Sequence, residues 1–513
     1  MRAVAVLPVV ALVVLAGCSV PFLGSGPNAS APTSGSSGMT EGDGTTGGAA
    51  EGNTGGPNGN TGAASAGTIP PDPANDALGW EGGYWYNESI AVTTDDGYNA
   101  SERAALVNVT MARVERIRGL EFTQSVPVEV ISRADYSRST GDGGGRSAAF
   151  RTFDNAKFEG LFLVGEDRNS LAVQQSNRGQ NVLGYYSPAN DSIVVVSPTA
   201  TPDIDPSTLA HELTHALQDQ QFNLSSSNPA TRDAYNARNG LIEGDANYIE
   251  DQYDAACEAE WQCTQAAAGS AGTATSGGGD STSSLDLGVY ILSYFPYADG
   301  PAFVSYLRSH GGWERVNAAY DDLPASAEQV IHPAKYGTDP PTNLTVTNST
   351  SNGWERVRPP GRPDYAVLGQ SALAATFGAT LYDDYNDSSV VAPGTFLNLE
   401  AGSVNTSDPF NYGFNYTNGW DGDRMAVYRK GNETGYVWTL AWDSPAEARE
   451  FVDGYHDLLS HWGGEPESGS GDVWVVRDDS PYSDAFRVTR DGDTVTIVNA
   501  PETGDLNDVH AAG

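Results

Sequence analysis

One short motif constrains this chain more than any other feature: the run His-Glu-Leu-Thr-His that begins at His211. The segment around it predicts a helix, because Asp205 and Pro206 suit the N-cap and the first helical position. Residues four apart lie on one face of a helix, so His211 and His215 would direct both imidazoles at one point. That arrangement suits a zinc ion, with Glu212 close enough to take a proton from a metal-bound water. The competing interpretation is a solvated helix with a coincidental histidine pair. The chain has only seven histidines in 513 residues, so such a pair would rarely arise by chance.

A catalytic zinc ion needs a third protein ligand and an open position for water. Residues 235–256 predict a second helix, which contains three small residues: Gly240, Gly244 and Ala246. Small residues at these positions indicate that another backbone comes close, with Glu243 between them and aimed at the partner helix. We therefore predict Glu243 as the third zinc ligand, with Asp245 and Glu250 as alternatives. The opposing interpretation is that Glu243 is one more surface acid.

The run HELTHALQDQ, followed by an EGDA element, resembles the zincin superfamily of the gluzincin type. More closely, the chain is similar to a group of zincin-like metallopeptidases found as haloarchaeal surface lipoproteins, with bacterial relatives. Four further segments match that group's pattern: residues 297–303, 311–313, 324–336 and 419–424. The similarity extends from about residue 100 to about residue 500, although the spacing of 28 residues from His215 to Glu243 is longer than in the best-known gluzincins. It implies a zinc-dependent peptidase that acts on a peptide or protein substrate.

Further site residues are less well determined by the sequence. His332 lies in one of the segments that resemble the family, and we predict it to be catalytic by stabilising a developing oxyanion. Tyr336 and Tyr248 are alternatives for that role, and the competing interpretation of His332 is a structural histidine on a loop. Because zinc-bound imidazoles need orienting partners, Asp245 or Asn247 is expected to hydrogen-bond one of them.

The composition is strongly acidic, with 66 Asp and Glu against 27 Lys and Arg and a formal net charge of −39. Only three basic residues are lysines. A dispersed acidic, lysine-poor surface is typical of a protein from a halophile, since it stays hydrated where salt screens its self-repulsion. It argues against a nucleic-acid partner, because polyanions repel each other.

The N-terminus predicts export. Arg2 is followed by an apolar run over residues 3–16 and then by Leu-Ala-Gly-Cys, which resembles a lipobox. We therefore predict a lipoprotein signal peptide at residues 1–17, lipidation of Cys18 and attachment to the extracellular face of the membrane. The absence of twin arginines favours the Sec route, and an uncleaved N-terminal anchor is the alternative. Residues 18–78 contain almost no large apolar side chains and predict a disordered tether.

Exported proteins often carry glycans and disulfides. Sequons for N-glycosylation recur along the chain, at Asn28, Asn87, Asn99, Asn190, Asn343, Asn348 and Asn432. Cys257 and Cys263 remain once Cys18 is assigned to lipid, and an oxidising exterior favours a disulfide between them. Two free thiols are the alternative.

We expect an α+β protein with two folded units, because the remaining chain is too long for one core. The first unit, residues 79–350, is predicted to be the zincin-like domain, a mixed sheet with active-site helices. Its expected elements are a helix at 101–117, strands at 128–131 and 161–164, a hairpin of 182–186 with 192–197, a loop insert at 264–284, and helices within 285–336. The strand at 192–197 is predicted to have an open edge that pairs with substrate, an interior strand being the alternative.

The second unit, residues 360–503, is predicted to be a smaller α+β accessory domain without a chemical motif of its own. Its expected helices are 367–381 and 444–459, and its expected strands are 424–429, 436–442, 473–477, 485–489 and 494–498. The sequence therefore predicts a lipid-anchored zinc metallopeptidase. The competing classes are a catalytically silent surface module for binding or envelope structure, and a zinc hydrolase of non-peptide substrates. The sequence leaves the oligomeric state open.

Overall fold

The computed structural model describes residues 69–92, 96–140, 146–264, 285–477 and 479–511. The predicted signal peptide, Cys18, most of the tether and nearly all of the 264–284 insert lie outside these residues. Within them the chain is α+β, as predicted, and none of the helices is long and apolar enough to cross a membrane.

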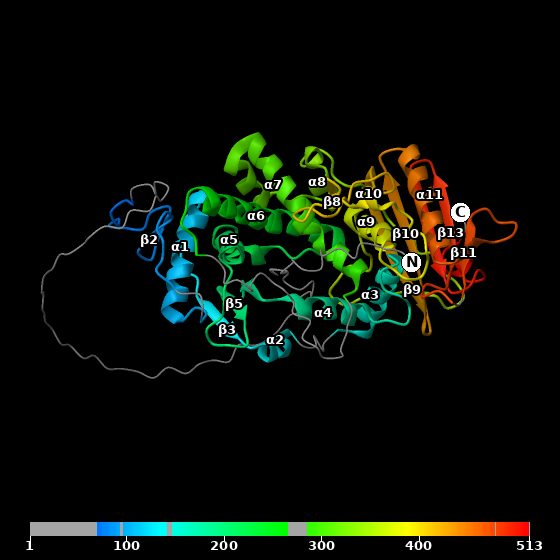
Figure 1. Cartoon of the computed structure of the whole chain (residues 1–513). Helices are drawn as coiled ribbons and strands as arrows, with labels where there is room; N and C mark the ends of the chain where they lie inside the picture. The colour runs from blue at the N-terminus through cyan, green and yellow to red at the C-terminus, as the bar shows by residue number, and fades with distance from the viewer. Residues whose placement is uncertain (1–68, 93–95, 141–145, 265–284, 478, 512–513) are drawn as a thin grey trace, which may run out of the picture.

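Three helices make the scaffold of the first unit: α5 (Pro206–Phe222), α6 (Arg232–Ala259) and α7 (Leu287–Asp321), which run through the centre of the molecule (Figure 1). Helix α5 begins as predicted, with Asp205 accepting hydrogen bonds from the backbone N–H groups of Ser207 and Thr208. Helix α6 includes the predicted residues 235–256 and is longer at both ends. The predicted disulfide is present and links Cys257, in the last turn of α6, to Cys263 beyond its C-terminus.

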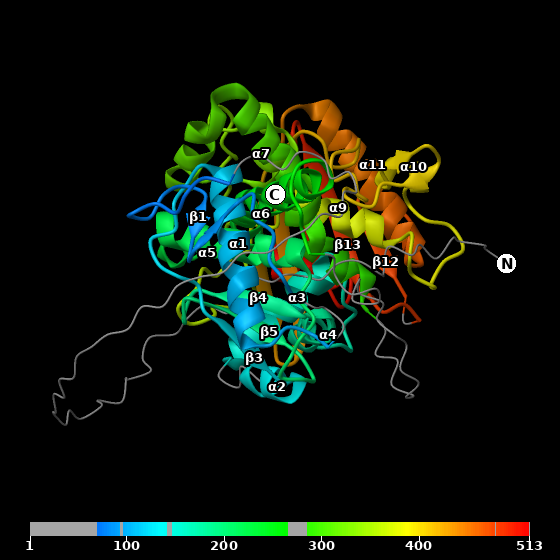
Figure 2. The ribbon, with the colours of Figure 1, turned by 60° about the vertical axis from the view of Figure 1, so that its left-hand side comes forward.

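Helix α1 (Ala100–Arg118) packs against both α5 and α6 (Figure 2). Its N-cap is Asn99, two residues before the predicted start of the helix at residue 101. The Asn99 side chain accepts from the N–H groups of Ser101 and Glu102, while the Glu102 carboxylate accepts from the Asn99 N–H, so the first turn is closed by a capping box.

The small sheet beside α5 has the order β3 (Val128–Ile131), β5 (Ser192–Val196), β4 (Gly184–Ser187). The predicted β4–β5 hairpin is confirmed. The prediction of an open edge at 192–197 is wrong, because β3 pairs in parallel with the far side of β5 and makes it the central strand. The strand with the open edge next to α5 is β4.

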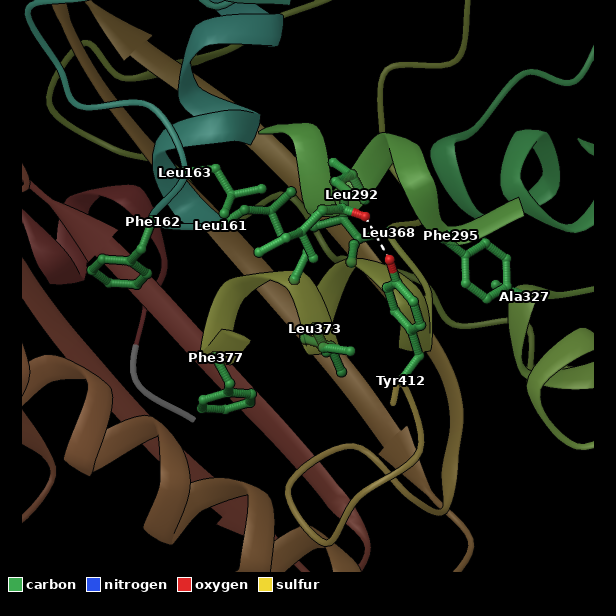
Figure 3. Close-up of a cluster of buried hydrophobic side chains, with 14 of the residues drawn as sticks. Leu161, Phe162, Leu163, Leu292, Phe295, Ala327, Leu368, Leu373, Phe377 and Tyr412 are labelled. Carbon is green, nitrogen blue, oxygen red and sulfur yellow. Dashed lines mark hydrogen bonds between the residues drawn. The ribbon is translucent and has the colours of Figure 1, made fainter. Parts of the chain in front are cut away.

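The strand predicted at residues 161–164 is also wrong. Helix α3 (Ala148–Gly160) ends there in a turn, in which the N–H groups of Leu163 and Val164 both donate to the carbonyl of Phe158. The run is apolar because all four side chains are buried in the core, not because it belongs to a sheet. Figure 3 shows three of them, Leu161, Phe162 and Leu163. Two other helices of this region, α2 (Arg133–Thr140) and α4 (Ser170–Asn181), were likewise not predicted.

The C-terminal part is a seven-stranded antiparallel sheet at one end of the molecule (Figure 1), with the order β11-β12-β13-β14-β10-β9-β6. Its strands are β6 (Glu355–Arg356), β9 (Trp420–Lys430), β10 (Glu433–Trp442), β11 (Gly464–Pro466), β12 (Val473–Val476), β13 (Ala485–Asp491) and β14 (Thr494–Ala500). The remaining helices are α8 (Ala327–Ile331), α9 (Gln370–Ala379), α10 (Pro393–Phe396), α11 (Pro445–His461) and α12 (Leu506–Val509). Of these, α11 and α12 pack directly on the sheet, whereas α8 packs against α6 and α7. Short strand pairs β1–β2 (Trp80–Glu81, Tyr84–Trp85) and β7–β8 (Leu399–Glu400, Ser403–Val404) complete the described strands.

Alternation along β9 divides its side chains between two cores. Met425 and Val427 face the large cluster formed with α3, α9 and α11, while Ala426 and Tyr428 face a smaller cluster closed by α12. The large cluster also contains residues of α7, so one apolar core joins residues from both predicted units. A hydrogen bond also links the two predicted units: the hydroxyl of Tyr412 donates to the carbonyl of Ile291 on α7 at 2.7 Å. It is the dashed line in Figure 3.

Candidate metal centre

Helices α5 and α6 bring three predicted ligands together at one point. The Nε2 atoms of His211 and His215 are 3.1 Å apart, and Glu243 Oε2 lies 3.4 Å from the first and 3.2 Å from the second. Zinc at about 2.0–2.1 Å from each of three tetrahedral ligands would require these atoms to be about 3.3 Å apart. The triangle therefore has the dimensions of one face of a zinc tetrahedron.

The charge of this cluster also suits a cation. Burial would raise the pKa of Glu243, but the two imidazoles outweigh it and lower that pKa to about 2. Burial would lower the pKa of His211, but Glu243 and Glu250 outweigh it and raise that pKa well above its usual value. Within the described residues, the Oε2 atom of Glu243 is buried without a hydrogen-bond partner. Two imidazoles and a buried carboxylate that attracts positive charge fit a zinc ion, with His211, His215 and Glu243 to hold it.

The other nitrogen of each imidazole is held by a side chain. His211 Nδ1 lies 3.0 Å from Glu250 Oε2, and His215 Nδ1 lies 2.9 Å from Gln218 Oε1. The Gln218 amide in turn donates to the carbonyl of Ile242 on α6 at 2.9 Å. With Nδ1–H donated in this way, each Nε2 lone pair is available to a metal. Glu250 is therefore an orienting residue and not the alternative ligand considered from the sequence.

The orienting role predicted for Asp245 or Asn247 is wrong for Asp245. Its carboxylate forms an ion pair with Arg118 at 3.0 Å and accepts a hydrogen bond from the Tyr320 hydroxyl at 2.7 Å. The pair is buried, and the Arg118 guanidinium lies 4.3 Å from the centre of the Trp313 ring. Asp245 thus ties α6 to α1 and is neither a ligand nor a partner of an imidazole. Asn247 lines a cavity beside His211.

Glu212 lies between the metal cluster and strand β4. Its Oε2 accepts from the backbone N–H of Tyr186 at 2.6 Å, while its Oε1 is buried without a hydrogen-bond partner among the described residues. Burial raises the pKa of Glu212, against the opposing effect of the two imidazoles. A desolvated carboxylate with a free oxygen next to a metal site is suited to accept a proton.

Strand β4 directs backbone groups towards Glu212 and the candidate metal ligands. The N–H of Val196 donates to the carbonyl of Leu183, so pairing with β5 alternates and the backbone groups of Gly184 and Tyr186 point away from β5. The bond from Tyr186 to Glu212 is consistent with that direction. An extended peptide could therefore pair with β4 beside the metal ligands.

The catalytic role predicted for His332 finds no support in the geometry. His332 caps the end of α8, its Nε2 lies 3.2 Å from the Gln370 amide, and it lines neither cavity beside the metal ligands. Its two alternatives are also engaged elsewhere: Tyr336 donates to the carbonyl of Asp322, and Tyr248 contacts Arg308.

Two cavities open beside the cluster, and Tyr297 lines both. One, of about 310 Å³, begins at His211 and is walled by α5, α6, α7 and the loop that carries Asp408. The other, of about 40 Å³, begins at Glu243. Among the described residues, one other group of acids has metal-binding spacing: Glu159, Glu166 and Asp484, where α3 meets the C-terminal sheet.

Three residues of the site, Gln218, Glu250 and Tyr186, were not predicted in these roles. Gln218 had a usable signal, because it lies three residues after His215 and therefore on the same face of the helix. Glu250 was recognised only as a possible ligand. The contact of Tyr186 depends on the packing of β4 against α5, which no local pattern specifies.

Comparison with known proteins covers only the C-terminal part. Residues 355–510 match a family described as a domain of unknown function (DUF8575), and this range is close to the second unit expected from the sequence. No curated protein and no solved structure matches the chain.

Proposed function

We propose that this chain is a zinc-dependent metallopeptidase of the zincin type. The observation that carries the proposal is the buried triangle of His211, His215 and Glu243 with the free carboxylate oxygen of Glu212 beside it. A solvated helix with a chance histidine pair would bury neither the pair nor its partners. The zincin-like first domain and the accessory role of the C-terminal unit belong to the same proposal.

Zinc bound by these residues would lower the pKa of a water molecule and polarise the scissile carbonyl. Glu212, whose Oε1 has no hydrogen-bond partner among the described residues, would take a proton from the attacking water and pass it to the amine nitrogen as the peptide bond breaks. Glu250 and Gln218 hold the imidazoles so that both Nε2 atoms face the metal. The open edge of β4 pairs with the substrate backbone and places its carbonyl next to Glu212.

We also propose that the enzyme acts outside the cell. The support is the N-terminal segment, with Cys18 as the lipidated residue, and the Cys257–Cys263 disulfide, which is typical of an oxidising compartment. Residues 18–78 would then hold the peptidase away from the membrane.

The test compares the full chain with Glu212→Gln in high salt, measuring zinc content by elemental mass spectrometry and hydrolysis of a mixed peptide library. We expect one zinc per chain in both proteins and cleavage only in the parent. Glu258→Gln, at an exposed position near the end of α6, is a matched control and should cleave like the parent. Zinc in both with cleavage in neither would favour a surface binding module, and absence of zinc in the parent would refute the metal assignment.

A further inference from the structure

The larger cavity beside the metal ligands has walls of two kinds. Its apolar wall comes from α7 and consists of Tyr294, Tyr297, Ala298, Pro301 and Ala302. The two tyrosine rings are stacked with their centres 5.9 Å apart. A volume of about 310 Å³ is at the lower end of the range for small-ligand sites and suits one long side chain.

The polar wall of this cavity is acidic. Glu250, Asp251 and Asp408 line it, and none of the described residues around it is a lysine or an arginine. One carboxylate oxygen of Asp408, Oδ1, is buried and has no hydrogen-bond partner among the described residues. Burial raises the pKa of Asp408 to about 6, so the group is still ionised above neutral pH. Glu250 already contacts the imidazole of His211, so Asp251 and Asp408 are the carboxylates that would contact a ligand in this cavity.

The smaller cavity, on the Glu243 side of Tyr297, has the opposite character. It is lined by Arg178 and Arg232 together with several amides, and Glu243 is its one carboxylate. An acidic surface alone would make both cavities acidic, since acids outnumber bases more than twofold in this chain. The difference between the two sides is therefore a property of the site and not of the overall composition.

We infer that the larger cavity is a specificity pocket for a lysine or arginine side chain next to the scissile bond of the substrate. The aliphatic stem would lie on the tyrosine rings and the small residues of α7, and the cationic group would meet Asp408 and Asp251. An apolar side chain would leave these carboxylates desolvated and unpaired, and an acidic one would be repelled. The inference rests on the proposed peptidase function and adds a substrate class to it.

The test uses fluorogenic peptides that are identical except for Arg, Lys, Gln or Glu at one of the two positions flanking the scissile bond. The full zinc-loaded chain is assayed in high salt. We expect kcat/KM for Arg or Lys to exceed that for Gln by about tenfold or more at one of the two positions, and Glu to be the poorest. Asp408→Asn should lower the Arg-to-Gln ratio by about tenfold, with zinc content measured to confirm that the metal centre is intact.

Two further variants make the result interpretable. Asp251→Asn, at an exposed position, should also lower the ratio and does not depend on folding around a buried substitution. Glu258→Gln removes one charge from the same helix outside the cavity and should leave the ratio unchanged. A ratio near one in the parent, or one that neither aspartate variant changes, would overturn the pocket while cleavage itself upheld the peptidase. If neither the fluorogenic peptides nor the mixed library were cleaved, both proposals would be overturned.

Discussion

Replacing Gly244 by alanine tests the contact that sets the position of α6, and with it Glu243. A β-carbon at Gly244 would lie 2.3 Å from the carbonyl oxygen of Gly300 and 2.7 Å from its Cα, on α7. Both partners are backbone atoms, so no side chain can rotate away. To restore ordinary contact, the helices must separate by on the order of 1 Å.

The net effect follows from two opposing terms. Overpacking at a rigid site costs typically about 1–3 kcal/mol, and the upper end applies where backbone meets backbone. Alanine recovers about 1 kcal/mol in helix propensity. We therefore expect Gly244→Ala to lower the free energy of unfolding by about 2 kcal/mol. The same displacement moves the adjacent Glu243 relative to α5, so zinc affinity should fall by about tenfold or more.

The assay is urea unfolding in high salt, together with competition for zinc against a chelator. Gly504→Ala is the matched control, because its β-carbon would meet nothing within 4 Å, and its stability should change by less than about 1 kcal/mol. Unchanged stability and zinc affinity in Gly244→Ala would refute the close crossing of α6 and α7 at Gly300.

Three further predictions concern single residues. Glu250→Gln should weaken zinc binding by about tenfold to a hundredfold, measured by chelator competition, because the amide supports the His211 imidazole less well than a carboxylate; equal affinity would remove Glu250 from the site. Arg118→Leu should destabilise the fold by about 3–5 kcal/mol in urea unfolding because it leaves Asp245 buried without its ion pair, and adding Asp245→Leu should recover much of the loss. Burial, and to a lesser extent the charge of Glu166, raises the pKa of Asp484 from 3.8 to about 7. The folded state therefore favours the protonated form of Asp484. The stability that Asp484 contributes should be complete below about pH 4 and fall by up to about 4 kcal/mol as pH rises towards 7, and Asp484→Asn should remove that part of the measured pH dependence.

Local patterns predicted the elements whose signals are local. The N-cap of α5, the β4–β5 hairpin and the five strands predicted in the C-terminal sheet follow from residues within a few positions of each other. Residues 161–164 failed because a short apolar run fits a buried turn as well as a strand. The prediction of an open edge at 192–197 failed because β3, more than 60 residues earlier in the sequence, pairs with β5. Parallel pairing over that separation leaves no pattern in the sequence of either strand.

The meeting of His211 and His215 was predictable because a helix fixes which residues share a face, whereas the residues that support them depend on how two helices are rotated against each other. Asp245, Asn247 and Glu250 all lie within two turns of Glu243, and sequence alone did not distinguish them. The structure distinguishes them, because Asp245 forms an ion pair with Arg118 of α1 and Glu250 contacts the imidazole of His211.

The small residues of α6 were interpreted correctly as the mark of a close backbone, but the backbone is that of α7 and not of α5. Gly240 and Gly244 lie four apart on one stripe, and that stripe contacts Gly300. Glu243 is one position before Gly244, about 100° around the helix, so seating the stripe on α7 turns Glu243 towards the histidines of α5. The glycines therefore influence the position of Glu243 from a neighbouring face of the same helix. A larger residue at either position would be expected to weaken zinc binding without touching a ligand.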